Sequence, residues 1–70
     1  MPGYLVDSSN LYGVDYEPWN RTLTFTFRSG FVYEYYGVPA SDCDGLLAAD
    51  SPGRFHHEQI KYNYSYRRIL

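Results

Sequence analysis

Cysteine, long apolar runs and a leader-like N-terminus are scarce or missing in this chain of 70 residues. The single Cys43 excludes an internal disulfide, so we expect a reducing, cytoplasmic setting. No apolar run approaches the ~20 residues that a membrane span needs, and we expect no membrane partner. The first residues include no basic segment followed by an apolar one, so we expect no signal peptide.

The side-chain sets that carry catalysis or hold a metal are also missing from the sequence. His56 and His57 are adjacent, so they diverge on a helix, and no Cys or carboxylate completes a zinc-binding set with them. Cys43 could act as a nucleophile with a distant histidine as its base, but this is the weaker interpretation. The position of Cys43 on the apolar face of a predicted helix is better explained by a buried structural cysteine. We therefore expect a non-enzymatic protein with no cofactor.

Aromatic residues, by contrast, are abundant. They make up 20% of the chain, and nine of them are tyrosines. Seventy residues form one domain, here 1–70 with a core at about 8–68, and such a domain buries only roughly 60% of its unfolded surface. Some of the aromatic surface is therefore expected to meet a partner.

A β-hairpin centred on Arg28-Ser29-Gly30 is the clearest structural signal in the sequence. With a three-residue loop, Phe27 pairs with Phe31, Phe25 with Tyr33 and Leu23 with Tyr35, so six apolar side chains share one face. With a two-residue loop the apolar side chains divide between both faces. Gly30 suits the left-handed position that ends a three-residue loop, and we predict that register.

The remaining elements predict an α+β fold, a three- or four-stranded antiparallel meander with two short helices packed on one face. Residues 1–7 are expected to form a loose lead-in, residues 10–16 a first strand, and 22–28 and 31–36 the hairpin. Ser41 is expected to cap a first helix, and Ser51-Pro52 a second that ends near Ile60 or Tyr62. Whether residues 62–70 form a strand or an interaction tail is left open.

Charge divides unevenly along the chain. Residues 1–50 hold seven acidic and two basic residues, a net charge of −5, whereas residues 51–70 hold four basic and one acidic residue, a net charge of +3. Bases interleaved with tyrosines at the C-terminal end are typical of proteins that bind single-stranded nucleic acid. Tyr36 joins them because it falls on the hairpin face opposite the core. The candidate ligand-binding residues are Tyr36, Arg54, His57, Lys61, Tyr64, Tyr66, Arg67 and Arg68.

Two spaced segments follow one another in the sequence, Gly30-x-x-Tyr33-x-Tyr35-x-x-Val38-Pro39 and Ala49-x-Ser51-x-Gly53-x-Phe55. Their order and spacing resemble the KTSC domain, a family named after the C-terminal segment of some lysyl-tRNA synthetases. The likeness covers about residues 8–68. It implies a short non-enzymatic module that occurs alone, in bacteria and their phages, or fused to a tRNA synthetase, with a role in RNA binding by analogy.

Two classes of function follow as expectations. The first is a module that binds RNA or a nucleotide-type ligand through a basic, Tyr-rich C-terminal surface. The second is a protein-interaction or self-assembling module, for example a phage-encoded protein that sequesters a host factor or a signalling nucleotide at the interface of a homo-oligomer. The sequence leaves ligand identity, oligomeric state and host process open.

Overall fold

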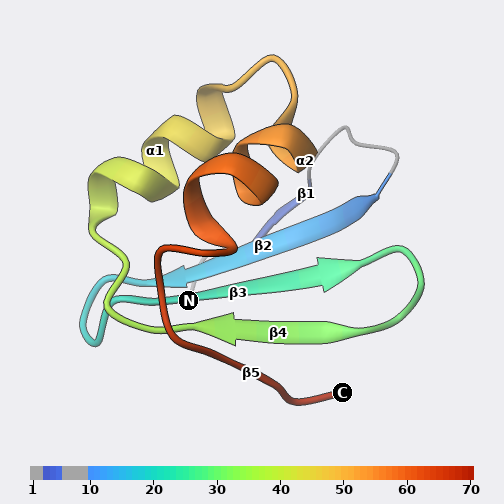
Figure 1. The fold of residues 1–70 in the computed structure, drawn as a ribbon, viewed down its shortest axis with the longest axis horizontal. Coiled ribbons are helices and arrows are strands. Elements are labelled where there is room, and N and C mark those ends of the chain that lie inside the picture. Colours follow the sequence, from blue (N-terminus) through green and yellow to red (C-terminus); the bar gives the residue numbers. More distant parts are fainter. Residues whose placement is uncertain (1–2, 6–9) are drawn as a thin grey trace.

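The computed structural model describes residues 3–5 and 10–70, so residues 1–2 and 6–9 lie outside its described part. An antiparallel sheet runs in the order β1-β2-β3-β4-β5, each strand pairing with the next along the chain (Figure 1). The strands are β1 Gly3–Leu5, β2 Leu11–Glu17, β3 Thr22–Phe27, β4 Val32–Tyr35 and β5 Tyr66–Arg68. The predicted α+β meander is confirmed, and the described residues form five strands where three or four were expected.

The two edge strands refine the expectation from the sequence. The loose lead-in predicted for residues 1–7 is wrong for Gly3–Leu5, which pair with β2 in the register Gly3↔Asp15 and Leu5↔Gly13. Three residues carry too little periodicity to identify a strand from sequence. The C-terminal segment, for which a strand and an interaction tail were both open, contains the strand β5, which pairs with β4 at Tyr33↔Arg68 and Tyr35↔Tyr66.

The hairpin between β3 and β4 has the predicted three-residue loop. Leu23 pairs with Tyr35 and Phe25 with Tyr33. The Phe27 amide donates to the Phe31 carbonyl over 2.9 Å, and Gly30 has a φ of 98°, which glycine adopts without strain. This register places the aromatic side chains of both strands on the face that the helices cover.

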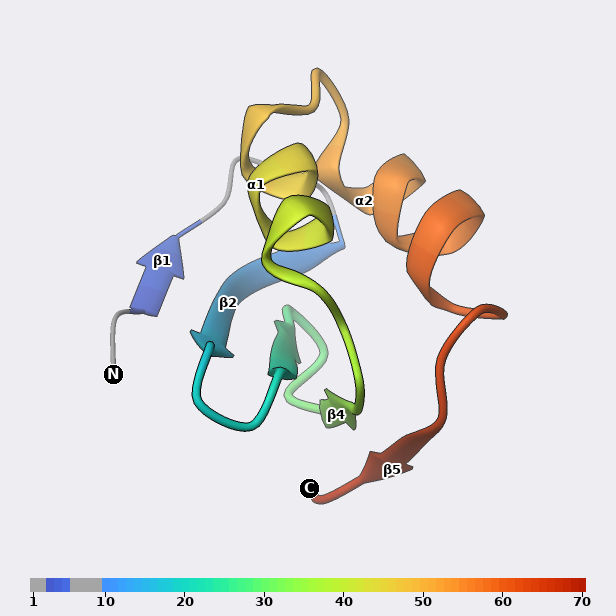
Figure 2. The same cartoon turned by 90° about the vertical axis from the view of Figure 1, so that its left-hand side faces the viewer.

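Three helical segments lie together on that face of the sheet (Figures 1 and 2). They are α1 Ala40–Ala48, α2 Pro52–Phe55 and the π-helix η1 His56–Ile60. The predicted cap at Ser51 is confirmed, since its hydroxyl accepts from the Arg54 amide over 3.3 Å. The predicted cap at Ser41 is wrong: Pro39 is the N-cap with extended backbone, and its carbonyl already accepts from the Asp42 amide over 3.0 Å.

The core lies between this helical layer and the sheet. Phe25, Leu46 and Ile60 have no exposed surface, and Tyr16 donates its hydroxyl hydrogen to the Val38 carbonyl over 2.7 Å. Cys43 is buried on α1, as predicted from its position on the apolar helix face. The core therefore fixes the helices against β2, β3 and β4, while the C-terminal part of the chain folds back along β4.

Candidate functional site

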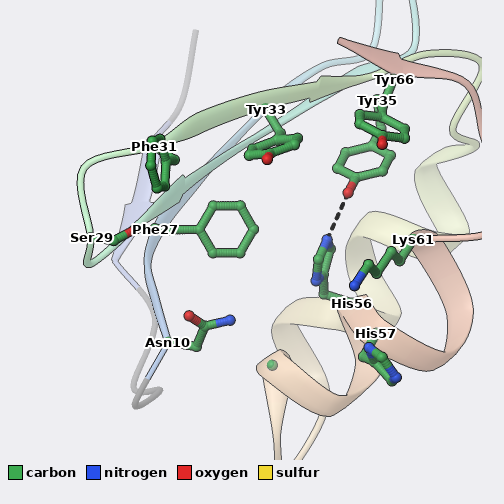
Figure 3. A pocket seen from close by; sticks show the side chains of 11 residues that line it. Asn10, Phe27, Ser29, Phe31, Tyr33, Tyr35, His56, His57, Lys61 and Tyr66 are labelled. Carbon is green, nitrogen blue, oxygen red and sulfur yellow. Dashed lines mark hydrogen bonds between the residues drawn. The ribbon is translucent and has the colours of Figure 1, made fainter. Parts of the chain in front are cut away.

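An open cleft lies between the hairpin end of the sheet and the π-helix η1 (Figure 3). Its volume is about 330 Å³, at the lower end of the range for small-molecule sites. The residues around it come from β3, β4, β5, α2 and η1, together with the loops nearby. They are Asn10, Phe27, Ser29, Phe31, Tyr33, Tyr35, Gly53, His56, His57, Lys61 and Tyr66.

Aromatic rings form one side of the cleft because the hairpin register gathers them on a single face. Phe27 meets Tyr33 edge-on at a centroid distance of 5.5 Å, and Tyr33 lies 5.6 Å from Tyr66. Tyr66 is also 5.4 Å from Tyr35. Phe31 and Tyr66 remain 44% and 55% exposed, so both offer ring surface to a ligand.

His56 forms the inner wall of the cleft and is only 6% exposed. Its ring packs 4.6 Å from Phe25 and 5.4 Å from Phe27, and its Nε2 lies 3.0 Å from the Tyr35 hydroxyl. Burial, helped by the charge of Lys61, lowers the pKa of His56 to about 4. Burial likewise raises the pKa of Tyr35 to about 12, so both groups are neutral at pH 7.

Cationic side chains stand at the rim. The π-helix brings Lys61 one turn beyond His56, since the Lys61 amide donates to the His56 carbonyl over 2.8 Å. The Lys61 ammonium lies 5.4 Å from the Tyr62 ring centre, and the Arg68 guanidinium lies 4.8 Å above the Phe31 ring. None of the described residues that line the cleft is acidic, so its charge is positive although the chain is acidic overall.

Three of the predicted ligand-binding residues meet in this cleft. His57, Lys61 and Tyr66 line it, and Arg68 stands next to it above Phe31. They come from η1, from its C-cap residue and from β5, which β4 and the helical layer bring to the same end of the molecule. The cleft therefore combines tyrosine with basic side chains as predicted, but with fewer residues than the predicted set.

The structure places the other predicted residues elsewhere. Tyr36 and Arg67 lie in a hollow on the opposite sheet face, where the Tyr36 hydroxyl donates to Glu34 and Arg67 pairs with Glu34 at 3.9 Å. Arg54 borders a shallow hollow with Asp50 and Glu58. The half-buried Tyr64 donates its hydroxyl hydrogen to Asp42 of α1, which ties the C-terminal segment to the helical layer.

The site also includes residues that sequence reasoning assigned to the core or left out. Tyr33 and Phe27 are only partly buried, because the helices cover the Tyr35 end of the sheet more fully than the hairpin end. His56 carries no signal of its own in the sequence. Its partner Tyr35 is 21 residues away, and only the folded chain brings the two side chains together.

Within the described part of the chain, no three side chains of His, Cys, Asp or Glu gather in a way that could hold a metal ion. No helix among the described residues is both long and apolar enough to cross a membrane.

Comparison with known proteins agrees with this architecture. The family model described as "KTSC domain" matches residues 7–64. The crystal structure of a KTSC domain protein from Yersinia pestis superposes with a TM-score of 0.91 at 36% identity, over 99% of this chain and 97% of that one. A likeness of this extent covers both the sheet and the helical layer.

Curated relatives fall into two groups. The lysine–tRNA ligase of Nostoc sp. is 41% identical over 54 residues, which are 77% of this chain but 10% of the ligase. A protein of Stutzerimonas stutzeri is 38% identical over 70 residues, 99% of both chains, and a protein of Tsukamurella paurometabola is 41% identical over 80% of this chain and 84% of its own length. The same domain thus occurs both inside a much longer ligase and as a short protein.

Proposed function

This chain belongs to the KTSC domain family, and from that premise we propose that it is a small non-enzymatic module that binds RNA or a nucleotide-type ligand in the aromatic cleft. One observation carries the proposal: exposed aromatic rings and cations share a cleft that no described acidic residue lines. Nucleotides present a flat ring system and an anionic phosphate, which call for these two kinds of partner.

The size of the cleft favours one nucleotide unit. Its volume of about 330 Å³ is near the lower limit for small-molecule sites, too little for an extended strand to lie inside. The unit can be a free nucleotide or one residue of a single-stranded RNA whose other residues stay outside. The domain's presence within lysine–tRNA ligases, proteins named for acting on tRNA, adds support for the RNA source.

Stacking on Phe31 tests the proposal. We expect Phe31→Leu to weaken binding of a short single-stranded RNA by about 1–3 kcal/mol, because one base loses its aromatic partner. Fluorescence anisotropy with labelled RNA, with unlabelled ribonucleotides as competitors, measures the loss and distinguishes strand from free nucleotide. Trp19→Leu is the matched control: Trp19 is 89% exposed but lies in the turn between β2 and β3, outside the cleft.

Two outcomes would contradict the proposal. Equal effects of Phe31→Leu and Trp19→Leu would show that the cleft does not hold the base. An absence of any binding to RNA or ribonucleotides at micromolar protein would remove the function altogether.

Self-assembly is the second candidate, and one observation favours it. In the described residues β5 ends the sheet, with its outer edge unpaired, and Ile69 and Leu70 beyond it are 45% and 72% exposed. Such edges add strands from other chains unless charge discourages them, and Arg67 and Arg68 stand on this one. Light scattering on the same samples tests it, since a monomer at high concentration removes this candidate.

A further inference from the structure

The second ring nitrogen of His56 is the least explained polar atom of the cleft. Nε2 is occupied by the Tyr35 hydroxyl, whereas the structure shows no hydrogen bond between Nδ1 and any described residue. The side chain is 6% exposed and lines the cleft. Figure 3 shows its ring between Phe27 and Lys61, with Nε2 directed at Tyr35. Among the described residues no fully buried side-chain nitrogen or oxygen lacks a partner, so Nδ1, which makes no described hydrogen bond, must reach the surface of the cleft, where a ligand atom can approach it.

The hydrogen bond between Tyr35 and His56 decides which ring nitrogen of His56 carries the proton. Tyr35 is 2% exposed, and its hydroxyl makes its one described hydrogen bond with Nε2 of His56. If Nε2 carried the hydrogen, the hydroxyl hydrogen would have no acceptor in a buried site. If the hydroxyl donates to Nε2, both groups are satisfied and the ring hydrogen resides on Nδ1. We assign this second tautomer, which presents an N–H donor to the cleft.

We propose that the His56 Nδ1–H and the Lys61 ammonium together hold the phosphate of the nucleotide, with Tyr35 as the residue that positions the ring proton. This inference rests on the proposed function and adds an orientation to it. The phosphate lies at the η1 end of the cleft and the base at the hairpin end, against Phe31 and Tyr33. Both proposed contacts are donors, so they favour a group that only accepts hydrogen bonds.

The charges around His56 agree with an anion at this position. Lys61 and His57 both act to lower the pKa of His56, which places two groups that can carry positive charge near the ring. The imidazole is therefore neutral at pH 7 and its N–H can donate without a second desolvated cation. A bound phosphate would be attracted by the Lys61 ammonium, and no described acidic residue lines the cleft to compete for that charge.

Removal of the Tyr35 hydroxyl tests the assignment. We expect Tyr35→Phe to weaken binding of a ribonucleoside 5′-monophosphate about tenfold or more, because the ring proton is no longer held on Nδ1 and one hydrogen bond to a charged group is lost. Binding of the matching ribonucleoside, which lacks the phosphate, should change less than twofold. Calorimetric titration of all four monophosphates and nucleosides into wild type and variant measures both.

Tyr16→Phe is the matched control for the loss of a buried hydroxyl. Tyr16 is 7% exposed and its hydroxyl bonds the Val38 carbonyl at 2.7 Å, outside the cleft-lining set. This variant should lower stability similarly without changing affinity for the monophosphate. If Tyr35→Phe and Tyr16→Phe weaken binding alike, the effect is on stability alone and the inference is overturned.

Nitrogen-15 NMR of the wild-type protein gives a readout that needs no variant to fold. The His56 signals at pH 7 should show the proton bonded to Nδ1, and a proton bonded to Nε2 would overturn the assignment. If nucleotides bind but Tyr35→Phe weakens nucleoside and monophosphate equally, the phosphate site is wrong while the proposed function stands. If no ribonucleotide and no RNA binds, both are wrong.

Discussion

A buried histidine makes the stability of this protein depend on pH below neutrality. The pKa of His56 is about 4 in the folded protein but near 6.5 in an unfolded chain. As pH falls, the unfolded chain binds the proton first. The contribution of neutral His56 to the free energy of unfolding is therefore complete above about pH 6.5 and is lost progressively toward pH 4. A difference of this size corresponds to a free energy on the order of 3 kcal/mol.

Urea unfolding at pH 7 and at pH 4.5 measures this loss. Carboxylates titrate over the same range, so the comparison is between variants. We expect His56→Gln to reduce the pH dependence of the free energy of unfolding, whereas His57→Gln, which changes an exposed neighbour, should retain it. Equal pH dependence in wild type and His56→Gln would contradict the assignment of the shift to His56.

The burial of a residue can be predicted from the sequence where it depends on helical or strand periodicity. It cannot be predicted where it depends on a contact with a residue that is distant in the sequence. Cys43 and Tyr35 were placed in the core from helical and strand spacing, and both are buried. His56 could not be placed, because its position depends on a hydroxyl 21 residues away and on an extra residue in the helical turn. The tautomer argument likewise needs the folded contact.

At the level of elements, α1 and α2 approach closely at Gly45. A Cβ built there would lie 2.9 Å from Cζ of Phe55, closer than real contacts allow. From sequence alone Gly45 is only a helix-weakening residue, and Gly45→Ala should stabilise by roughly 1 kcal/mol. The structure reverses the sign, because the methyl group must displace a ring packed against the core.

A double-mutant cycle separates the two effects. We expect Gly45→Ala alone to destabilise by about 1 kcal/mol, and the same change in a Phe55→Leu background to stabilise, since the shorter side chain makes room. Denaturant unfolding of the four proteins gives the coupling energy. Additive effects within 0.3–0.5 kcal/mol would show that the ring moves aside freely and that the glycine is not needed for packing.

The sequence predicts some elements more completely than others. The hairpin register follows from alternation and from Gly30, whose φ of 98° the turn requires. The second helix was predicted with its cap and its end near Ile60, but its second half is a π-helix. A run of nine residues is too short for the apolar period to distinguish 3.6 residues per turn from a wider turn.

Across the whole molecule, alternation along β5 divides the basic C-terminal segment between two faces. Tyr66 and Arg68 pair with Tyr35 and Tyr33 and so share their face with the cleft, whereas Arg67 pairs with Glu34 on the opposite face. The sequence showed a cluster of bases within residues 54–68, but side-chain direction depends on the register of β5. The predicted single basic surface is therefore two surfaces.

This division predicts which cation a nucleic-acid ligand depends on. Lys61→Met should weaken binding of single-stranded RNA and reduce the slope of log affinity against log salt by about 0.7, the value for one phosphate contact in a single strand. Arg67→Met changes the net charge of the protein equally but lies on the far face, so slope and affinity should stay close to wild type. Anisotropy titrations from 50 to 300 mM KCl measure both variants.

Identical slopes for Lys61→Met and Arg67→Met would mean that RNA responds to overall charge and not to the cleft. A larger effect of Arg67→Met would move the binding face to the side of the sheet that carries Glu34 and Tyr36.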